Sequence, residues 1–250
     1  FYRIFPPVVV MVLVVMPFTF LIRRDFVSGI GTQIAAVMGF VTNFYEMMTG
    51  GSYEAQFIPH LFVHNWSLAV EVHYYLLWGL AVWYLAKYCK TAGQLRGSIF
   101  LLSSLGLLIS FLSMFIGGLL GLSFSGLYFS TWTHIYPFFV GSILATLTGI
   151  KQPTGLLKKV IRSWSLREAC LVFAAGAGLL VVMMLWVKFD SLFTYLFGFL
   201  LASLSAAVMI LATRVLHEKP PDLKEPLVLT AIADTSYGIY LFHWPFYTIF

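Results

Sequence analysis

The chain has 250 residues, 60% of them apolar and 10% charged, and its mean hydropathy is +0.90. An average soluble domain carries about 25% charged residues, so this composition excludes a soluble globule, a disordered chain and a disulfide scaffold. The net charge of +5 comes mainly from basic residues in short loops between apolar runs, which indicates membrane topology rather than a nucleic-acid partner.

The apolar runs predict an all-α, polytopic bundle of transmembrane helices, because a β-barrel would need alternating apolar and polar residues. A bilayer core requires about 20 residues per helix. Seven segments meet or approach that length: 4–22, 67–86, 99–119, 132–149, 169–187, 194–212 and 237–250.

An eighth segment, 30–48, is only weakly hydrophobic, because it contains glycine, threonine, glutamine and asparagine. It either spans the membrane or re-enters it, and the weak hydrophobicity favours re-entry. A re-entrant backbone is tolerated only where protein buries it or water surrounds it, so re-entry would place 30–48 at the functional centre.

The distribution of basic residues predicts the orientation of a multi-pass cell-membrane protein. Eleven of the fifteen Lys and Arg residues lie in loops 87–98, 150–168 and 213–235, which helix parity puts on one side. We expect that side to be cytoplasmic. Segments 45–66 and 118–131 contain no Lys or Arg and are expected outside.

The loops are short, so residues 1–250 are expected to form one integral-membrane domain. The chain opens at Phe1 without Met and stops at Phe250 within an apolar run, so we interpret it as an internal piece of a longer protein, truncated at both ends. Its two cysteines are expected to be free thiols.

A polar face is predicted on the helix that begins near Ser67. Ser67, Glu71 and Tyr75 lie at i, i+4 and i+8, and therefore on one side of the helix. Glu71 is the only acid in this apolar run, and a carboxylate at membrane depth is costly unless it faces a partner or a wet cavity. A structural ion pair or a protonated, hydrogen-bonded Glu71 is the alternative interpretation.

The last span repeats this pattern with Ser236, Tyr240, His243 and Tyr247 on one face. Pro245 removes a backbone donor there and is expected to kink the helix. His243 is as compatible with a structural hydrogen bond as with a functional role.

A third candidate, His134, lies at the outer start of its span, where Gly141 is expected to admit a neighbouring helix. The sequence contains no phosphate-binding loop, dinucleotide fingerprint, metal-ligand spacing or nucleophile elbow. We therefore expect no metal.

At these segments the chain resembles the membrane-bound acyltransferase-3 family. The resemblance rests on Trp66-Ser67-Leu68-Ala69-Val70-Glu71 with the following Tyr74-Tyr75-Leu76-Leu77-Trp78, on Tyr2-Arg3-Ile4-Phe5-Pro6, on Phe138 to Ala145, and on Ser236 to Pro245. It covers essentially the whole chain. The amino-acid sequences of segments 60–66 and 133–139 are most similar to those of the peptidoglycan O-acetyltransferase branch of Gram-positive bacteria.

The resemblance implies an enzyme that moves an acetyl group from cytoplasmic acetyl-CoA to a hydroxyl outside the membrane. In that branch the acceptor is the C6 hydroxyl of N-acetylmuramic acid in peptidoglycan, and a C-terminal extracellular domain completes the transfer. The family's first helix, with its catalytic His and the first Arg of Arg-x-x-Arg, would precede Phe1. This piece alone is therefore expected to be inactive.

The resemblance and the polar faces together assign roles to nine residues. Arg3 is expected to meet the CoA phosphates by a charge-assisted contact. The expected catalytic residues are Glu71, Tyr75, Tyr240 and His243, with Glu71 orienting a histidine or holding a proton and a tyrosine relaying acetyl or a proton. The expected substrate path consists of His64, Trp66, Ser67 and His134.

Three other functions stay open at this point. The first is acetylation of a different surface polysaccharide. The second is a transporter or channel, because such proteins also use midplane charges and broken helices, although no inverted repeat is visible. The third is a non-catalytic scaffold, which would have no need for Glu71 and its polar face. The basic loops would also sit well against anionic lipid of the bilayer.

Overall fold

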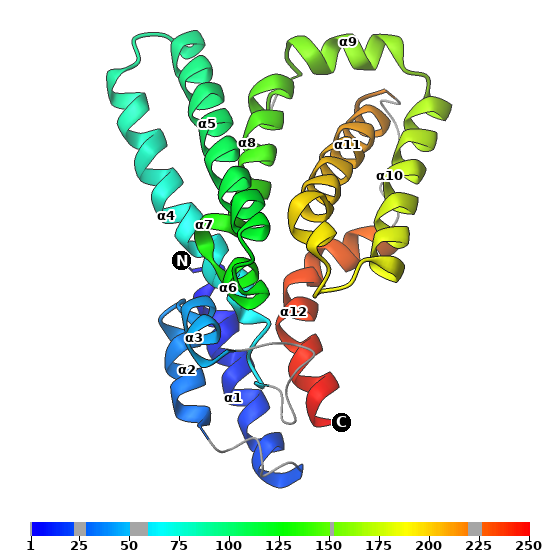
Figure 1. Ribbon diagram of the computed structural model, residues 1–250. Coiled ribbons are helices and arrows are strands. Elements are labelled where there is room, and N and C mark those ends of the chain that lie inside the picture. Colours follow the sequence, from blue (N-terminus) through cyan, green and yellow to red (C-terminus); the bar gives the residue numbers. More distant parts are fainter. Residues whose placement is uncertain (1, 23–28, 51–59, 151–152, 220–226) are drawn as a thin grey trace. The chain divides into compact units, whose positions relative to one another are not determined.

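The computed structural model describes residues 2–22, 29–50, 60–150, 153–219 and 227–250 (Figure 1). Every regular element in these ranges is a helix, so the all-α prediction is confirmed. The elements are α1 (Phe5–Ile22), α2 (Ile30–Met38), α3 (Thr42–Thr49), α4 (Asn65–Tyr88), α5 (Ala92–Leu119), α6 (Phe124–Phe129), α7 (Thr131–His134), α8 (Tyr136–Thr148), α9 (Gly155–Ser163), α10 (Leu166–Trp186), the π-helical turn η2 (Thr194–Gly198), α11 (Phe199–Glu218) and α12 (Leu227–Ile249).

Within the described ranges, five helices are long and apolar enough to cross a membrane: α1, α4, α5, α10 and the continuous stretch of η2 and α11. In α10 only Ala169 is buried by the rest of the protein. The other apolar side chains of α10 therefore need a lipid surrounding, since soluble proteins rarely expose apolar surface of this extent. The helices thus support a multi-pass membrane protein.

The predicted span over 132–149 forms as two shorter helices, α7 and α8, separated at Ile135. Pro137 explains the break. A proline inside a helix loses one hydrogen bond and clashes with the carbonyl four residues earlier, but it is tolerated in the first turn. The chain therefore starts a new helix at Tyr136, which places Pro137 at the second position of α8.

Segment 30–48 contains two short helices, α2 and α3, rather than one spanning helix. The break lies at 39–41, where Phe40 has a left-handed φ of 52°. A helix of the length of α2, nine residues, extends about 14 Å, which is less than half of the bilayer core. Membrane re-entry of this segment stays a prediction, and Arg23 and Arg24, which precede it, lie outside the described residues.

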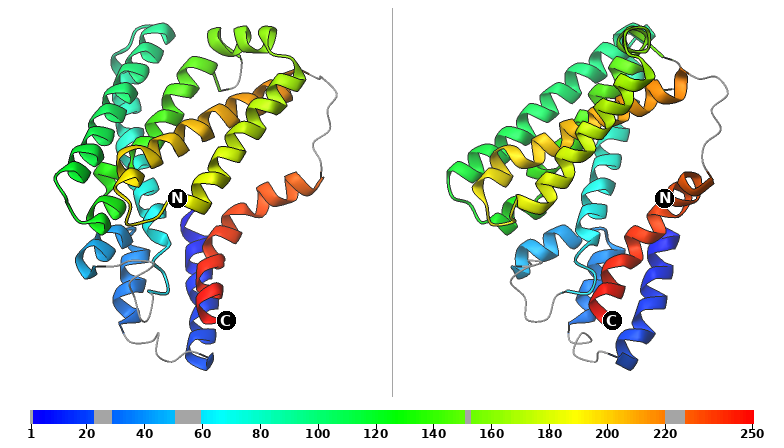
Figure 2. Two further views of the ribbon diagram at one scale, coloured as in Figure 1. Left: turned by 45° about the vertical axis from the view of Figure 1, so that its right-hand side comes forward. Right: turned by 90° about the vertical axis from the view of Figure 1, so that its right-hand side faces the viewer.

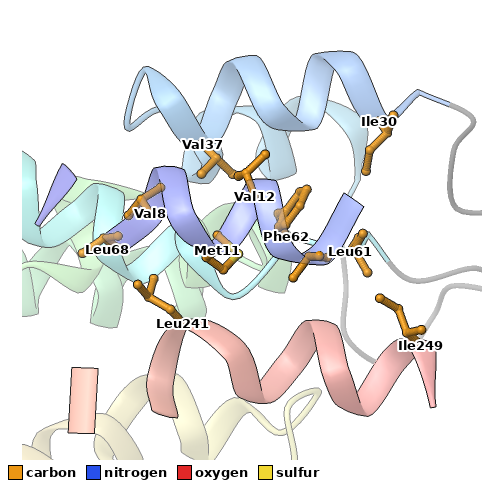
Figure 3. Close-up of a cluster of buried hydrophobic side chains, with 11 residues drawn as sticks. Val8, Met11, Val12, Ile30, Val37, Leu61, Phe62, Leu68, Leu241 and Ile249 are labelled. Carbon is orange, nitrogen blue, oxygen red and sulfur yellow. The ribbon is translucent and has the colours of Figure 1, made fainter. Parts of the chain in front are cut away.

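The chain divides into two compact units. The first unit comprises residues 1–73, 128–131 and 224–250. Its core joins α1 to α2, to the start of α4 and to α12, as Figure 3 shows. The buried side chains are Val8, Met11, Val12, Val15, Ile30, Val37, Leu61, Phe62, Leu68, Leu241 and Ile249.

The second unit comprises residues 74–127 and 132–223. Within it α5 packs against α8, and α10 lies beside α11, as both views of Figure 2 show. The short amphipathic helix α9 is fastened to α10 and α11 by a small core of Leu157, Ala169 and Val215.

The basic segments of the second unit gather at one of its ends. The turn between α4 and α5 and the helix α9 lie at the same end in Figure 1. Lys219, at the end of α11, donates to the carbonyl of Trp164, just after α9, and Arg214 donates to the carbonyl of Gly149. The predicted orientation requires these basic segments to lie on the same side of the membrane. Their cytoplasmic location stays a prediction.

A close helix approach in the second unit occurs at Gly106, and none occurs at Gly141 among the described residues. A Cβ built on Gly106 would lie 2.6 Å from the ring of Phe139, whereas one built on Gly141 would have no atom within 4 Å. The Phe139 ring cannot turn away freely, because the rings of Tyr74 and Trp78 pack edge-to-face with it at 5.5 and 5.6 Å. The expected approach at Gly141 was therefore wrong.

We expect Gly106→Ala to lower the free energy of unfolding by about 1–3 kcal/mol, the usual cost of overpacking a tight contact. Gly141→Ala is the matched control, and it should be neutral or slightly stabilising because alanine favours a helix over glycine. Unfolding of the detergent-solubilised protein, followed by circular dichroism, measures both. Equal stability of the two variants would show that the Gly106 contact is loose.

Candidate active site

The first unit places His64 against a backbone carbonyl that Pro245 has left without its helical partner. In a regular helix the N–H of residue 245 would bond to the carbonyl of Leu241, but proline has no N–H. The Nε2 atom of His64 lies 3.0 Å from this carbonyl oxygen. Pro245 therefore creates the acceptor that holds His64 in place, and α12 continues through the proline to Ile249.

This contact determines which nitrogen of His64 carries the proton. The carbonyl oxygen of Leu241 can only accept, whereas the amide nitrogen of Asn65, 3.2 Å from the same Nε2, can only donate. The contact to the carbonyl is the shorter of the two, so we assign the proton to Nε2, which leaves Nδ1 with its lone pair. Nδ1 is buried and has no hydrogen-bond partner among the described residues. Burial, assisted by the nearby His243, lowers the pKa of His64 to about 3, so its ring is neutral near pH 7.

Tyr240 and His243 of α12 surround the same residue. The hydroxyl of Tyr240 donates to the carbonyl of His64 at 2.6 Å, and the Ser67 hydroxyl lies 2.9 Å from the Tyr240 oxygen. Because Tyr240 uses its hydrogen on His64, Ser67 must be the donor in that second bond. The rings of His64 and His243 meet edge-to-face at 5.4 Å.

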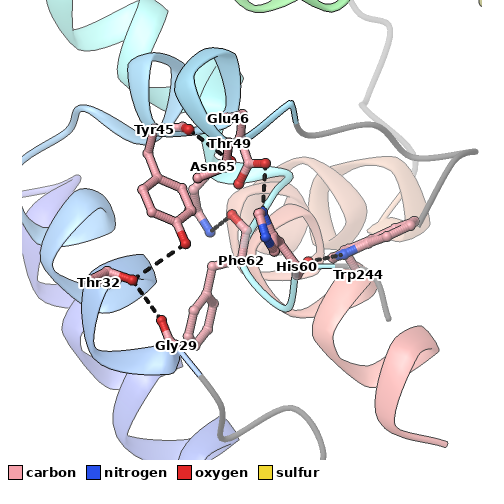
Figure 4. A network of polar contacts seen from close by, with 9 residues as sticks. All are labelled: Gly29, Thr32, Tyr45, Glu46, Thr49, His60, Phe62, Asn65 and Trp244. Carbon is pink, nitrogen blue, oxygen red and sulfur yellow. Dashed lines mark hydrogen bonds and ion pairs between the residues drawn. The ribbon is translucent and has the colours of Figure 1, made fainter. Parts of the chain in front are cut away.

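A buried ion pair lies near this group and was not among the sequence candidates. The Oε2 atom of Glu46, on α3, is 2.7 Å from Nδ1 of His60, and the Glu46 side chain is only 1% exposed. Trp244 of α12 donates to the carbonyl of His60 at 3.1 Å (Figure 4). The ring of Tyr45 packs against His60, and its hydroxyl meets Thr32 of α2 at 3.3 Å.

A second polar group of the first unit joins α3 to α4 through Thr131. The amide nitrogen of Asn43 donates to the hydroxyl of Thr131 at 3.0 Å, and Nδ1 of His73 lies 3.0 Å from the same oxygen. Asn43 and Glu46 are three residues apart on α3, and both are buried. This spacing, within a segment too polar for an ordinary span, is the signal that could have identified Glu46.

Three sequence candidates occupy other positions in the first unit. Glu71 is half-buried one turn after Ser67 and lies close enough to Tyr237 and Tyr240 to interact with them electrostatically. Trp66 is buried against the rings of Tyr128 and Phe129. Arg3 is exposed in the turn that precedes α1.

Two candidates belong to the second unit instead. Tyr75 is 49% exposed, and His134 is partly buried with its ring 4.8 Å from that of Phe199. The structure therefore brings together Ser67, His64, Tyr240 and His243 in one unit and assigns Tyr75 and His134 to the other. The catalytic and substrate-path roles of all these residues stay predictions.

The first unit also holds several buried acceptor atoms with no hydrogen-bond donor among the described residues. Besides Nδ1 of His64 they are the side-chain oxygens of Gln33, Thr42, Asn43 and Asn65. The amide nitrogens of both asparagines face backbone carbonyls, which settles the orientation of these amides. No group of three or more His, Cys, Asp and Glu in the described ranges could hold a metal ion.

Comparisons with known proteins agree with this picture. The family model described as "Acyltransferase domain", of the acyltransferase-3 type, matches residues 1–250. The chain is 28% identical to O-acetyltransferase OatA of Staphylococcus aureus over 247 residues, and 26% identical to peptidoglycan O-acetyltransferase OatA of Listeria monocytogenes over 261. These alignments cover 97% and 100% of this chain.

The chain spans 39% of the length of each of these two relatives. No solved structure matches it. The family match extends over every residue of the chain, and it agrees with the long apolar helices of the structure. The chain therefore belongs to the acyltransferase-3 family of membrane proteins.

Proposed function

We propose that this chain is the membrane part of an O-acetyltransferase that delivers acetyl groups from cytoplasmic acetyl-CoA to an extracytoplasmic cell-wall glycan. The proposed acceptor is the C6 hydroxyl of N-acetylmuramic acid in peptidoglycan. The observation that carries the proposal is the alignment of nearly the whole chain with two proteins named as O-acetyltransferases, one of them for peptidoglycan. Because those proteins are longer, we also propose an extracellular C-terminal domain as the partner that completes transfer.

The basic ends of the second unit support the proposed direction of transfer. Loops 87–98, 150–168 and 213–235 would face the cytoplasm, where acetyl-CoA is made, because basic residues favour that side. Residues 151–152 and 220–226 of these loops lie outside the described ranges. Arg3, exposed ahead of α1, is the proposed contact for the CoA phosphates.

The proposed chemistry uses the free nitrogen of His64. The oxygen of an acceptor hydroxyl attacks the thioester carbonyl carbon, and His64 Nδ1 takes the hydroxyl proton as the C–O bond forms. The C–S bond then breaks, and the CoA thiolate leaves and receives that proton. A thiolate is far more basic than His64, since a thiol has a pKa of about 8.5, so the second proton transfer is downhill.

The neighbours of His64 would act by positioning it or by moving protons. Tyr240 holds the backbone of His64 through a hydrogen bond to its carbonyl oxygen, and Ser67 donates to Tyr240. His243 sits against its ring, and Glu71, which interacts with Tyr240, would orient a histidine or hold a proton. Tyr75, Trp66 and His134 remain proposed for the acetyl or substrate path.

We expect Glu71→Gln to lower acetyl transfer by about 10–100-fold, because it removes the carboxyl group that would orient a histidine or hold a proton while it preserves shape. The full-length protein in membranes is supplied with acetyl-labelled acetyl-CoA, and label is followed on protein and on cell-wall glycan. Glu218→Gln, in the exposed pair with Arg214, is the matched control and should transfer normally.

The destination of the label tests each part of the proposal. Label on muramic acid supports the peptidoglycan acceptor, whereas label on another polysaccharide retains the enzyme class and changes the acceptor. A well-folded wild type that transfers no acetyl group would contradict the proposed function and favour transport. Transfer by Glu71→Gln at the wild-type rate would contradict the role of Glu71.

A further inference from the structure

Two cavities in the second unit are lined by the same cationic side chain, Arg96. The larger one measures about 600 Å³ and lies between α4, α5 and α8; the smaller one measures about 270 Å³. Arg96 and Thr146 line both of them. Most of the remaining wall is apolar, with Trp78, Val82, Leu95, Ile99, Ala145 and Ile150 in the larger cavity and Phe100 and Leu147 in the smaller one.

Arg96 is the only charged side chain that lines either cavity in the described part of the chain. It is exposed. The neighbouring Lys87 differs, because its ammonium group makes cation–π contacts with the rings of Trp83 and Tyr88, at 5.7 and 5.8 Å from their centroids. A single guanidinium that lines two apolar cavities is complementary to an anionic group that carries apolar chains.

Small residues keep the larger cavity open. Gly79 of α4 lines it, and a Cβ built on Gly79 would have no atom within 4 Å. Ser142 of α8 also lines it and accepts a hydrogen bond from Tyr74 at 3.2 Å, which leaves the hydroxyl hydrogen of Ser142 able to donate. The cavity thus offers an apolar volume, a cation and a hydroxyl donor.

We propose that this pair of cavities binds one anionic diacyl phospholipid of the surrounding membrane. The phosphodiester lies against Arg96, one acyl chain occupies each cavity, and Ser142 donates to an ester carbonyl. The walls include α4 and α5, which are both long and apolar enough to cross the bilayer, so we expect lipid to reach the cavities. Basic sites between transmembrane helices near the basic membrane face are known binding places for anionic headgroups.

The test is a lipid titration of the full-length protein in mild detergent, followed by native mass spectrometry. Dioleoyl phosphatidylglycerol is the anionic probe and dioleoyl phosphatidylcholine the zwitterionic one. We expect one phosphatidylglycerol to remain bound and to be preferred by about fivefold, as one basic residue beside an anionic lipid supplies. Arg96→Gln should abolish this preference. Lys90→Gln, which removes an exposed charge from the same loop outside the cavities, should retain it.

A second pair of variants tests the cavity itself. Gly79→Leu fills the larger cavity and should lower the retention of both lipids at least fivefold. Gly178→Leu makes the same change on α10, where a Cβ also has open space, and should leave retention unchanged. Circular dichroism of both variants establishes that they are folded.

Three results would overturn the proposal. Equal retention of the two lipids by the wild type excludes selection of an anionic headgroup. Normal retention in Gly79→Leu excludes the cavity as the binding place. A parallel titration with acetyl-CoA is the third: if Arg96→Gln weakens binding of acetyl-CoA and leaves lipid retention intact, the guanidinium serves the nucleotide and not a lipid.

Discussion

Replacing His64 with glutamine is expected to lower acetyl transfer by about 10²–10⁴-fold, the range for loss of a general base, while the protein remains folded. The glutamine amide nitrogen can still donate to the carbonyl of Leu241, which Pro245 leaves open. It cannot replace the unpartnered Nδ1. The change thus separates the basic nitrogen from the structural hydrogen bond. Transfer of labelled acetyl by the full-length protein in membranes measures the effect.

A double substitution tests whether the loss is chemical. His64→Ala removes the donor and should cost about 1–3 kcal/mol in the free energy of unfolding, because a buried carbonyl loses its partner. Adding Pro245→Ala restores a backbone N–H to that carbonyl and should recover part of this stability. Transfer should stay low in the double variant. Recovery of transfer together with stability would show that His64 is a structural residue only.

Removal of His60 should cost more stability than removal of its partner Glu46. The Glu46 side chain is 1% exposed and that of His60 is 21% exposed. His60→Ala leaves the buried carboxyl group of Glu46 without its hydrogen-bond partner, which typically costs about 1–3 kcal/mol or more. Glu46→Gln keeps a hydrogen bond to the histidine and should cost about 1 kcal/mol. Denaturant unfolding of the detergent-solubilised protein gives both values.

The exposed pair Arg214 and Glu218 is the matched control for this measurement. Its atoms are 3.4 Å apart and both side chains are about one-quarter exposed, so Glu218→Ala should change stability by less than about 1 kcal/mol. The hydrogen bond from the indole of Trp244 to the backbone carbonyl of residue 60 persists in His60→Ala. The loss of stability therefore reports on the His60 side chain. Losses of similar size at His60 and Glu218 would indicate that the buried pair is hydrated.

Several features of the candidate site could be predicted from the local sequence. Helical periodicity placed Ser67 and Glu71 one turn apart on α4, and it placed Tyr240 and His243 together on α12. The missing donor at Pro245 could also be recognised, because it follows from covalent structure. What the sequence could not supply was the partner of the freed carbonyl. His64 lies 177 residues from Leu241, and no local pattern encodes a contact at that separation.

The pairing of Glu46 with His60 shows the same limit. The local sequence around each residue predicts a loop or a weak helix. Only the packing of α3 brings the carboxyl group of Glu46 to the imidazole of His60. For Tyr75 the local pattern predicted too much. Tyr75 shares a face of α4 with Glu71, but the boundary between the two units lies at 73–74, so the two residues belong to different units.

Composition and hydropathy alone determined that this is an all-helical membrane protein, because the cost of leaving backbone polar groups unpaired in lipid admits few other solutions. Sequence motifs were sufficient to indicate the acyltransferase-3 family, which the match over the whole chain establishes. Only the tertiary structure decided that Nδ1 of His64 is buried without a partner among the described residues, that Glu46 is buried and where Arg96 meets apolar space. Those properties depend on side chains from distant helices, whose contacts are selected by packing of the whole core rather than by local propensity.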